Sequence, residues 1–114
     1  MRTVVDAFAI SDLATMAQGR FGDLVKAVVD VRQGVMVVDA DMHADEEALL
    51  LEEGARQGDL WGINLYPDRF GGPDFIEFDS VINIRPSQGN RSRTVEDPRA
   101  RAAIAEIVDR LVKP

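Results

Sequence analysis

The chain has 114 residues, of which 46% are hydrophobic and 29% charged, a composition typical of one ordinary globular domain. It has no cysteine, which excludes disulfides, thiolate metal ligands and a cysteine nucleophile. Its net charge of −7 disfavours binding to nucleic-acid phosphates. No apolar run approaches the roughly 20 residues of a membrane helix, and no signal peptide is visible. We therefore expect a single cytoplasmic domain over residues 1–114, without membrane contact.

The first half of the chain predicts a strand, a helix and a hairpin. Residues 3–8 have the composition of a short strand, and Ser11 is placed to cap the helix that follows. Residues 24–31 and 35–39 alternate as paired strands do, and Gly34 supplies the positive φ that a three-residue hairpin loop needs.

Residues 42–53 predict a second helix, which Asp41 would cap at its start and Gly54 would end. Two glutamates at its C-terminal end oppose the helix dipole. The alternative is a loop followed by a buried strand through residues 49–51.

The second half predicts another hairpin and a last helix. Residues 60–66 and 75–85 form the hairpin across a turn-rich loop, and the helix runs from Pro98 to about Lys113 with Asp97 as its N-cap. The resulting order is β-α-β-β-α-β-β-α. It predicts an α+β fold, with a single layer of mostly antiparallel sheet packed on one face by two or three helices.

Alternation within the second hairpin predicts one core face and one polar face. The core face receives Trp61, Ile63, Leu65 and the even-numbered residues from Ile76 to Ile84. The polar face gathers Asn64, Tyr66, Glu77, Asp79, Asn83 and Arg85. A solvated sheet face is the simpler interpretation, but amides, acids and a guanidinium favour a site more than threonine, lysine and glutamine would. Gly62 allows a close backbone approach or a bulge.

This polar stripe leads into the loop 86–93, Pro-Ser-Gln-Gly-Asn-Arg-Ser-Arg. Its hydroxyls, amides and guanidiniums suit a carboxylate or a phosphate. The predicted binding residues are Asn64, Tyr66, Asn83, Arg85, Ser87, Gln88, Asn90, Arg91 and Arg93. The loop lacks the Gly-Lys-Ser/Thr ending of a phosphate-binding loop, and we expect no cofactor. The alternative is a connection pinned by arginines that pair with the acids of residues 39–59.

Acidic side chains raise two further possibilities. Glu77 and Asp79 lie two apart on one strand face, so they are the candidate catalytic carboxylates, although an ion-pair network with Arg85 would use the same residues. His43 lies among acids that suit a cation, but without a second histidine or a cysteine we predict no metal site.

Three segments, at residues 43–54, 60–67 and 82–93, resemble a small bacterial family classed as a domain of unknown function. The similarity extends from about Phe21 to the last helix, and members of that family look like short stand-alone proteins. The resemblance implies that the chain is a complete protein. It implies no activity, so no catalytic residue can be carried over.

We hold two hypotheses for the function. The first is a binding or interaction module that presents the stripe and the 86–93 loop to an anionic ligand or a protein partner. A homodimer is one form of it, because residues 39–59 carry eight acids and one base, whereas residues 85–93 carry three arginines and no acid. The second is a small hydrolase or nuclease-like enzyme, in which the carboxylates act beside arginines of the same face.

Overall fold

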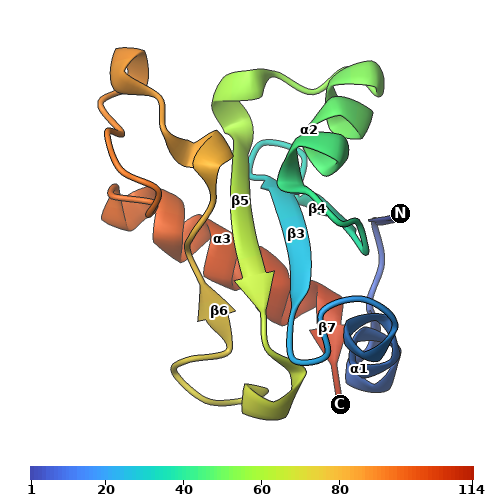
Figure 1. The fold of residues 1–114 in the computed structure, drawn as a ribbon. Coiled ribbons are helices and arrows are strands. Elements are labelled where there is room, and N and C mark those ends of the chain that lie inside the picture. The colour runs from blue at the N-terminus through green and yellow to red at the C-terminus, as the bar shows by residue number, and fades with distance from the viewer.

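A computed structural model describes all residues from 1 to 114. Its centre is a five-stranded antiparallel sheet in the order β1-β4-β3-β5-β6 (Figure 1). The strands are β1 (Arg2–Val4), β3 (Val25–Asp30), β4 (Val35–Val38), β5 (Leu60–Leu65) and β6 (Ile76–Glu77). The α+β class and the antiparallel sheet predicted from the sequence are confirmed.

Three α-helices and four short 3₁₀ turns pack around this sheet. The helices are α1 (Ile10–Gly19), α2 (His43–Glu52) and α3 (Pro98–Leu111). The 3₁₀ turns are η1 (Gln57–Asp59), η2 (Pro67–Arg69), η3 (Val81–Asn83) and η4 (Pro86–Gln88). None of the helices combines the length and the apolar character needed to cross a membrane.

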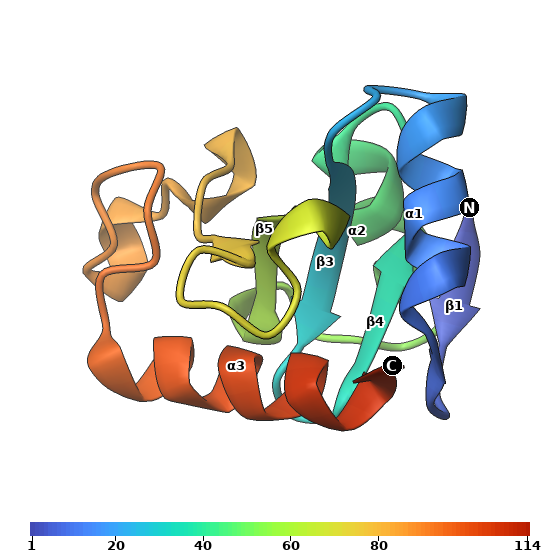
Figure 2. The same cartoon turned by 90° about the horizontal axis from the view of Figure 1, so that it is seen from below.

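The helices cover both faces of the sheet, so the prediction that they cover one face is wrong. Figure 2 shows α2 and α3 on opposite sides of the strands. The main core joins Val25, Ala27 and Val29 of β3 to α1 and α3, whereas Val28 faces the other way and packs with Leu50 of α2. Apolar residues lie on both faces of the sheet, so each face requires a cover.

The N-terminal strand is shorter than predicted. Residues 3–8 divide into β1 and a separate two-residue strand, β2 (Phe8–Ala9), which pairs in parallel with β7 (Val112–Lys113). The last helix therefore ends at Leu111. Ser11 does not cap α1, because the helix begins two residues earlier than predicted, with Ala9 as its N-cap.

The first hairpin and α2 are confirmed. Gly34 has a φ of 71° in the loop between β3 and β4, and residues 49–51 lie in α2 instead of a strand. Asp41 does not cap α2, however. Met42 is the N-cap without a side-chain hydrogen bond, and Asp41 instead accepts a 2.8 Å bond from Arg20. Gly54 follows the end of α2 with a φ of 97°, as predicted.

The second hairpin pairs over only two residues of β6, so the strand predicted to reach residue 85 is wrong in its second part. Asn83 explains the difference. Its side chain accepts a 2.8 Å hydrogen bond from Gly62 N and donates a 2.9 Å bond to Gly62 O, which satisfies the β5 backbone as a neighbouring strand would. Ser80 packs against Gly62 so closely that a Cβ there would lie 2.5 Å from its own.

The predicted faces hold for β5 but only in part for residues 75–85. Trp61, Ile63 and Leu65 enter the main core. Ile76 and Phe78 pack against that core, Ile82 packs against the smaller one, and Ile84 is exposed. The chain turns into η3 at Val81, which breaks the twofold alternation.

Candidate functional site

A cavity of about 290 Å³ lies where the N-terminal end of α2 meets the sheet, and we call it the α2 cavity. Lys26 of β3 and Asn64 of β5, which are register partners, come from its floor. The segment 79–82 forms the opposite wall. The polar residues of the lining are Lys26, His43, Asn64, Asp79, Ser80 and Arg93. The exposed side chains of Met42 and Val81 add an apolar rim.

Asn64 is the more deeply buried of the two predicted binding residues that line this cavity, with 6% of its surface exposed. Its Nδ2 donates a 2.8 Å hydrogen bond to Glu77 and a 3.3 Å bond to the carbonyl of Asp79. Its Oδ1 is buried and has no hydrogen-bond partner. Buried polar atoms in proteins are nearly always paired, so this oxygen is an exception.

His43 is the first residue of α2, and it is 8% exposed. Nε2 lies 2.7 Å from the carbonyl oxygen of Ile63, which can only accept, so Nε2 carries the proton and Nδ1 is an acceptor. Burial lowers the pKa of His43, and the bond to Ile63 only partly opposes this shift. The ring is therefore neutral at pH 7.

The α2 N-terminus and Lys26 supply unsatisfied donors to the cavity. No side chain caps α2, and the backbone N–H groups of His43 and Ala44 make no hydrogen bond within the protein. The Lys26 ammonium lies 5.1 Å from the centre of the Phe21 ring and has no carboxylate partner. A helix N-terminus carries partial positive charge, so both groups favour an anion.

The two candidate catalytic carboxylates are both held by donors. Arg93 donates two hydrogen bonds to Asp79, from Nε at 2.9 Å and from Nη2 at 3.1 Å. These bonds lower the pKa of Asp79 more than burial raises it. Glu77, outside the cavity lining, accepts hydrogen bonds from Asn64 at 2.8 Å and from Tyr66 at 3.1 Å. Burial and Glu77 together raise the pKa of Tyr66.

Arg85 has an interior position. It is 8% exposed, stacks 4.8 Å above Trp61 and donates to the carbonyls of Gln57 at 2.8 Å, Ile82 at 3.1 Å and Leu60. An ion pair of 3.8 Å joins it to Glu47 of α2, which is one of the pinning contacts that the sequence suggested. Burial lowers the pKa of Arg85, and Glu47 opposes that effect.

Asn90 organises the 86–93 loop from within. Its Nδ2 donates to the carbonyls of Asn83 at 2.7 Å, Ser92 at 3.1 Å and Thr94 at 2.8 Å, and its Oδ1 accepts from Glu96 N at 2.8 Å. Glu96 in turn accepts from the backbone N–H groups of residues 91 and 92. The loop is therefore a well-bonded connection.

The predicted binding residues thus divide into three groups. Asn64 and Arg93 line the α2 cavity, and Tyr66 belongs with them because it donates a hydrogen bond to Glu77, as Asn64 does. Asn83, Arg85 and Asn90 are buried and bonded to backbone groups. The exposed residues are Ser87, Gln88 and Arg91, of which Gln88 donates to Gly58 O at 3.1 Å.

Sequence reasoning missed Lys26, Ser80 and the α2 N-terminus as parts of the site, and it considered His43 only as a metal ligand. The structure brings no group of three or more histidine or acidic side chains together as metal ligands. One signal was available. Lys26 is the only base within β3, and its alternation places it on the same face as the α2 residues.

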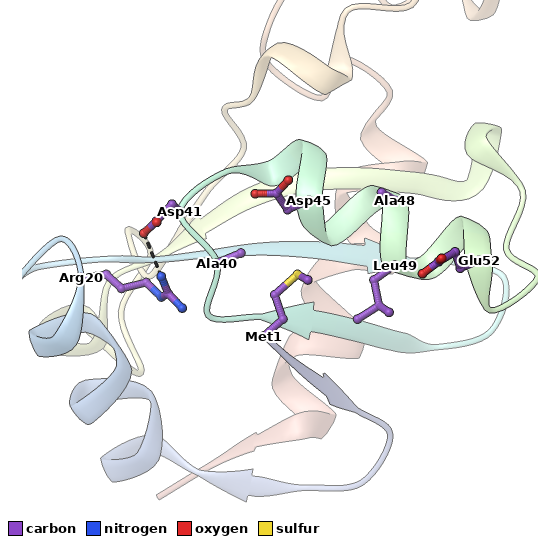
Figure 3. A pocket seen from close by; sticks show the side chains of 8 residues that line it. All are labelled: Met1, Arg20, Ala40, Asp41, Asp45, Ala48, Leu49 and Glu52. Atoms are coloured by element: carbon purple, nitrogen blue, oxygen red, sulfur yellow. Dashed lines mark hydrogen bonds and ion pairs between the residues drawn. The ribbon is translucent and has the colours of Figure 1, made fainter.

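A second hollow, of about 500 Å³, lies at the other side of α2, and we call it the Arg20 groove (Figure 3). Met1, Ala40 and the α2 residues Asp45, Leu49 and Glu52 surround Arg20 there. Arg20 bonds to both Asp39 and Asp41 at 2.8 Å. Asp39 has a φ of 69°, which is rare for a residue other than glycine.

Glu46 lies on the inner face of α2 and is fully buried. Neither carboxyl oxygen makes a well-formed hydrogen bond, although the Ala40 backbone lies against the group. Burial raises the pKa of Glu46 to about 10, against a smaller opposing effect of Ala40 and Lys26. Glu46 is therefore a neutral carboxylic acid at pH 7.

Comparison with known proteins gives a family but no characterised relative. Neither the curated proteins nor the solved structures contain a match to this sequence. A family model described as "Protein of unknown function (DUF5674)" matches residues 3–111, which is nearly the whole chain, and the protein therefore belongs to that family.

Proposed function

We propose that the protein is a binding module that holds a small anionic ligand in the α2 cavity. The observation that carries the proposal is the pair of unsatisfied donors at this cavity, the Lys26 ammonium and the uncapped α2 N-terminus. A chain with a net charge of −7 has few places that favour an anion. This cavity is one of them, because Lys26 and the first residues of α2 both line it.

The charges of the lining support an anion near α2. The charge of Arg93 is neutralised by Asp79, with which it forms a bidentate ion pair. His43 is neutral and contributes its ring without charge. Lys26 remains as the unpaired cation, beside the positive end of the helix dipole. A carboxylate or a phosphate is the group that these donors fit.

The 86–93 loop has a supporting role in this proposal. Its backbone is fixed by Asn90 and Glu96, and it positions Arg93 against Asp79 at the wall of the cavity. A dimer built on the acidic and basic segments has less support. Arg85 and Arg93 already have carboxylate partners, which leaves Arg91 as the only unpaired arginine of the loop.

The hydrolase or nuclease-like alternative also has less support than binding. A general base must accept a proton, whereas Arg93 lowers the pKa of Asp79 and occupies both of its oxygens. Glu77 lies outside the cavity and is held by Asn64 and Tyr66. Both carboxylates are thus already engaged by donors of the protein, which disfavours either of them as a general base.

The test is a titration of the protein with acetate and with inorganic phosphate, followed by amide chemical shifts in NMR spectra. We expect the largest shifts at Met42, His43 and Ala44, because the ligand accepts hydrogen bonds from this end of α2. Lys26→Gln should weaken binding about tenfold, since one charge-assisted contact is lost. Shifts that are scattered over the surface, or absent, would overturn the proposal.

Lys113→Gln is the matched control. Lys113 is the only other lysine of the chain, and it is exposed on β7, away from the cavity lining. The same change of charge there should leave the affinity unaltered. Equal losses in both variants would mean that the anion responds to net charge and not to the α2 cavity.

A further inference from the structure

A further cavity, of about 350 Å³, lies between α3 and the loop that joins β5 to β6, and we call it the α3 cavity. Figure 2 shows this loop, in yellow, next to the helix. We propose that the α3 cavity binds a small aromatic amine, with the ring among its phenylalanines and the ammonium at Asp109. This second site is independent of the α2 cavity, because the two share no lining residue.

The apolar part of the lining is rich in aromatic rings. Three of the five phenylalanines of the chain line the α3 cavity, namely Phe70, Phe75 and Phe78. Phe75 is buried, and its ring meets that of Phe70 edge to face, with the ring centres 5.2 Å apart. Phe70 and Phe78 pack against the main core but remain partly exposed. Aromatic rings favour offset and edge contacts at about 4.5–7 Å between centres, so the ring of a ligand can extend this cluster.

The walls of the α3 cavity are formed before any ligand binds. In the loop, Tyr66 N donates to the carbonyl of Phe75 and Gly72 N to that of Arg69, both at 3.0 Å. The opposite wall is the regular helix α3, which contributes the small side chain of Ala105. A ligand therefore pays little ordering entropy on entering, and the volume of about 350 Å³ suits a small molecule.

Asp109 gives the α3 cavity a preference for a cation. It is the only charged residue of the lining, and it forms no ion pair within the protein. It lies in the last turn of α3, where the negative end of the helix dipole also attracts a cation. The neighbouring Arg110 donates to the carbonyl of Gly34 at 2.7 Å and is thus engaged at the β3–β4 loop.

Arg101 sets the direction in which such a ligand lies. It precedes Asp109 by eight residues on α3, which at 1.5 Å per residue places it about 12 Å away along the axis. Its guanidinium lies 4.2 Å from the centre of the Phe78 ring, so that end of the cavity already has a cation. An ammonium is repelled there and attracted at Asp109. An aromatic ring joined to an ammonium by a short carbon chain fits this order of groups.

The test titrates the protein with 2-phenylethylamine, 2-phenylethanol and 3-phenylpropanoate, followed by amide chemical shifts in NMR spectra. The three probes share a phenyl ring and a two-carbon chain but end in an ammonium, a hydroxyl and a carboxylate. We expect shifts at residues 70–72 and 105–109, with the amine bound about fivefold more tightly there than the alcohol, as for an exposed ion pair. The carboxylate should bind most weakly at these residues.

An amine that binds no more tightly than the alcohol, or that shifts other residues instead, would overturn the inference. The proposed function has its own readout, the shifts of residues 42–44 with acetate and phosphate, so the two can fail separately.

Asp109→Asn tests the contact with the ammonium. The affinity ratio between the amine and the alcohol should fall close to one in this variant. Glu106→Gln is the matched control, because Glu106 is an exposed acid of the same helix outside the lining, and it should keep the wild-type ratio. Equal losses in both variants would mean that the amine responds to net charge, and would overturn the inference.

Ala105→Leu tests the place of the ring. The larger side chain enters the α3 cavity from an exposed helix position, so the amine and the alcohol should both bind at least about tenfold more weakly. Ala102→Leu, at an exposed position of α3 outside the lining, should bind both as the wild type does. Unchanged affinity in Ala105→Leu would overturn the inference. The comparison of the three probes on the wild-type protein decides it even if a variant does not fold.

Discussion

The two hollows that flank α2 contain similar residue types but differ in how their polar groups are satisfied. In the Arg20 groove, the guanidinium is bonded to two carboxylates, and the groups are accessible to water. In the α2 cavity, Asn64 Oδ1 is buried without a partner, and Lys26 has no counter-charge. The larger hollow is therefore the weaker candidate site, because its interactions are already complete within the protein.

The comparison also separates the origins of the two hollows. The α2 cavity depends on the close packing of the 79–82 segment over β5, where Ser80 lies against Gly62. The Arg20 groove depends on exposed ion pairs between α1 and the loop before α2. Packing is worth more than exposed ion pairs, so changes to the cavity should have the larger effects.

Gly62→Ala should have the largest effect. The new Cβ would lie 2.5 Å from Ser80 Cβ, so the 79–82 wall must move outward or the β5 backbone must shift. We expect the free energy of unfolding to fall by about 3 kcal/mol, as in other overpacked cores, and ligand binding in the α2 cavity to be lost. Urea denaturation followed by circular dichroism measures the first effect. Titration with acetate and inorganic phosphate measures the second.

Gly58→Ala is the control for that substitution. A Cβ at Gly58 meets only the flexible end of Gln88, at 3.4 Å, so stability and binding should stay near the wild-type values. A Gly62→Ala variant that kept both would show that the wall over β5 is not tightly packed.

Substitution of Glu46, on the inner face of α2, should give the next largest effect. Its folded pKa of about 10 lies above its ordinary value of 4.5, so the folded state holds a proton that the unfolded state releases. The stability that this proton provides is complete below pH 4.5 and is lost as the pH rises toward 10. Glu46→Leu removes the buried carboxyl and should raise the free energy of unfolding at pH 7 by about 2 kcal/mol.

The pH dependence provides the control for Glu46. In the wild type, the free energy of unfolding should decrease from pH 5 to pH 9, and this slope should be smaller in both Glu46→Leu and Glu46→Gln. Chemical denaturation at several pH values measures it. An unchanged slope in the glutamine variant would mean that Glu46 is ionised in the folded protein.

Substitution of His43 should change the free energy of unfolding less. The pH dependence that His43 causes has the opposite sign to that of Glu46. Burial keeps its folded pKa below the ordinary value of 6.5, so the unfolded state binds more protons in acid, and stability falls as the pH drops below about 6.5. His43→Phe removes this dependence. At pH 7 the free energy of unfolding of this variant should be lower by about 1 kcal/mol, because the hydrogen bond to Ile63 is lost.

The affinity for ligand distinguishes the structural role of His43 from its role in the site. His43→Gln can still donate to Ile63 and should fold with nearly wild-type stability at pH 7. If the His43 ring contacts the ligand of the α2 cavity, the same variant binds that ligand less tightly. Unchanged affinity in both variants would remove His43 from the site.

The elements that the sequence predicted well are those specified by local patterns. The β3–β4 hairpin follows from alternation and Gly34, and α2 follows from its composition and Gly54. The covering of both sheet faces is also indicated by a local pattern. Residues 35–38 are an unbroken apolar run, typical of a strand buried on two sides.

The remaining differences depend on contacts that alternation does not reveal. Asn83 replaces strand pairing with side-chain hydrogen bonds to Gly62. Residues 75–85, which have the pattern of a long strand, therefore form a turn in their second part. The α2 cavity likewise joins Lys26, His43 and Asn64 from three separate elements. The polar stripe supplied Asn64, but nothing in the order of residues showed which helix would cover it.

Arg20→Gln should have the smallest effect and would sharpen the contrast between the two hollows. Its hydrogen bond to Asp39, and then that to Asp41, raise the pKa of Arg20, but the guanidinium is exposed, and water and salt screen both pairs. We expect the melting temperature to change by less than about 2 °C, as for other surface ion pairs, and anion binding in the α2 cavity to be unaltered.

Asp39→Gly tests whether Arg20 stabilises the backbone conformation of Asp39 in addition to pairing with its charge. Arg20 holds Asp39 at a φ of 69°, a conformation that glycine adopts without strain. If the ion pair served mainly to fix this backbone, Arg20→Gln would be destabilising alone but not in combination with Asp39→Gly. Loss of anion binding in Arg20→Gln would contradict the independence of the two hollows, because the loop that starts at Asp39 leads directly to His43. Both variants therefore need the melting temperature and the binding titration measured on the same sample.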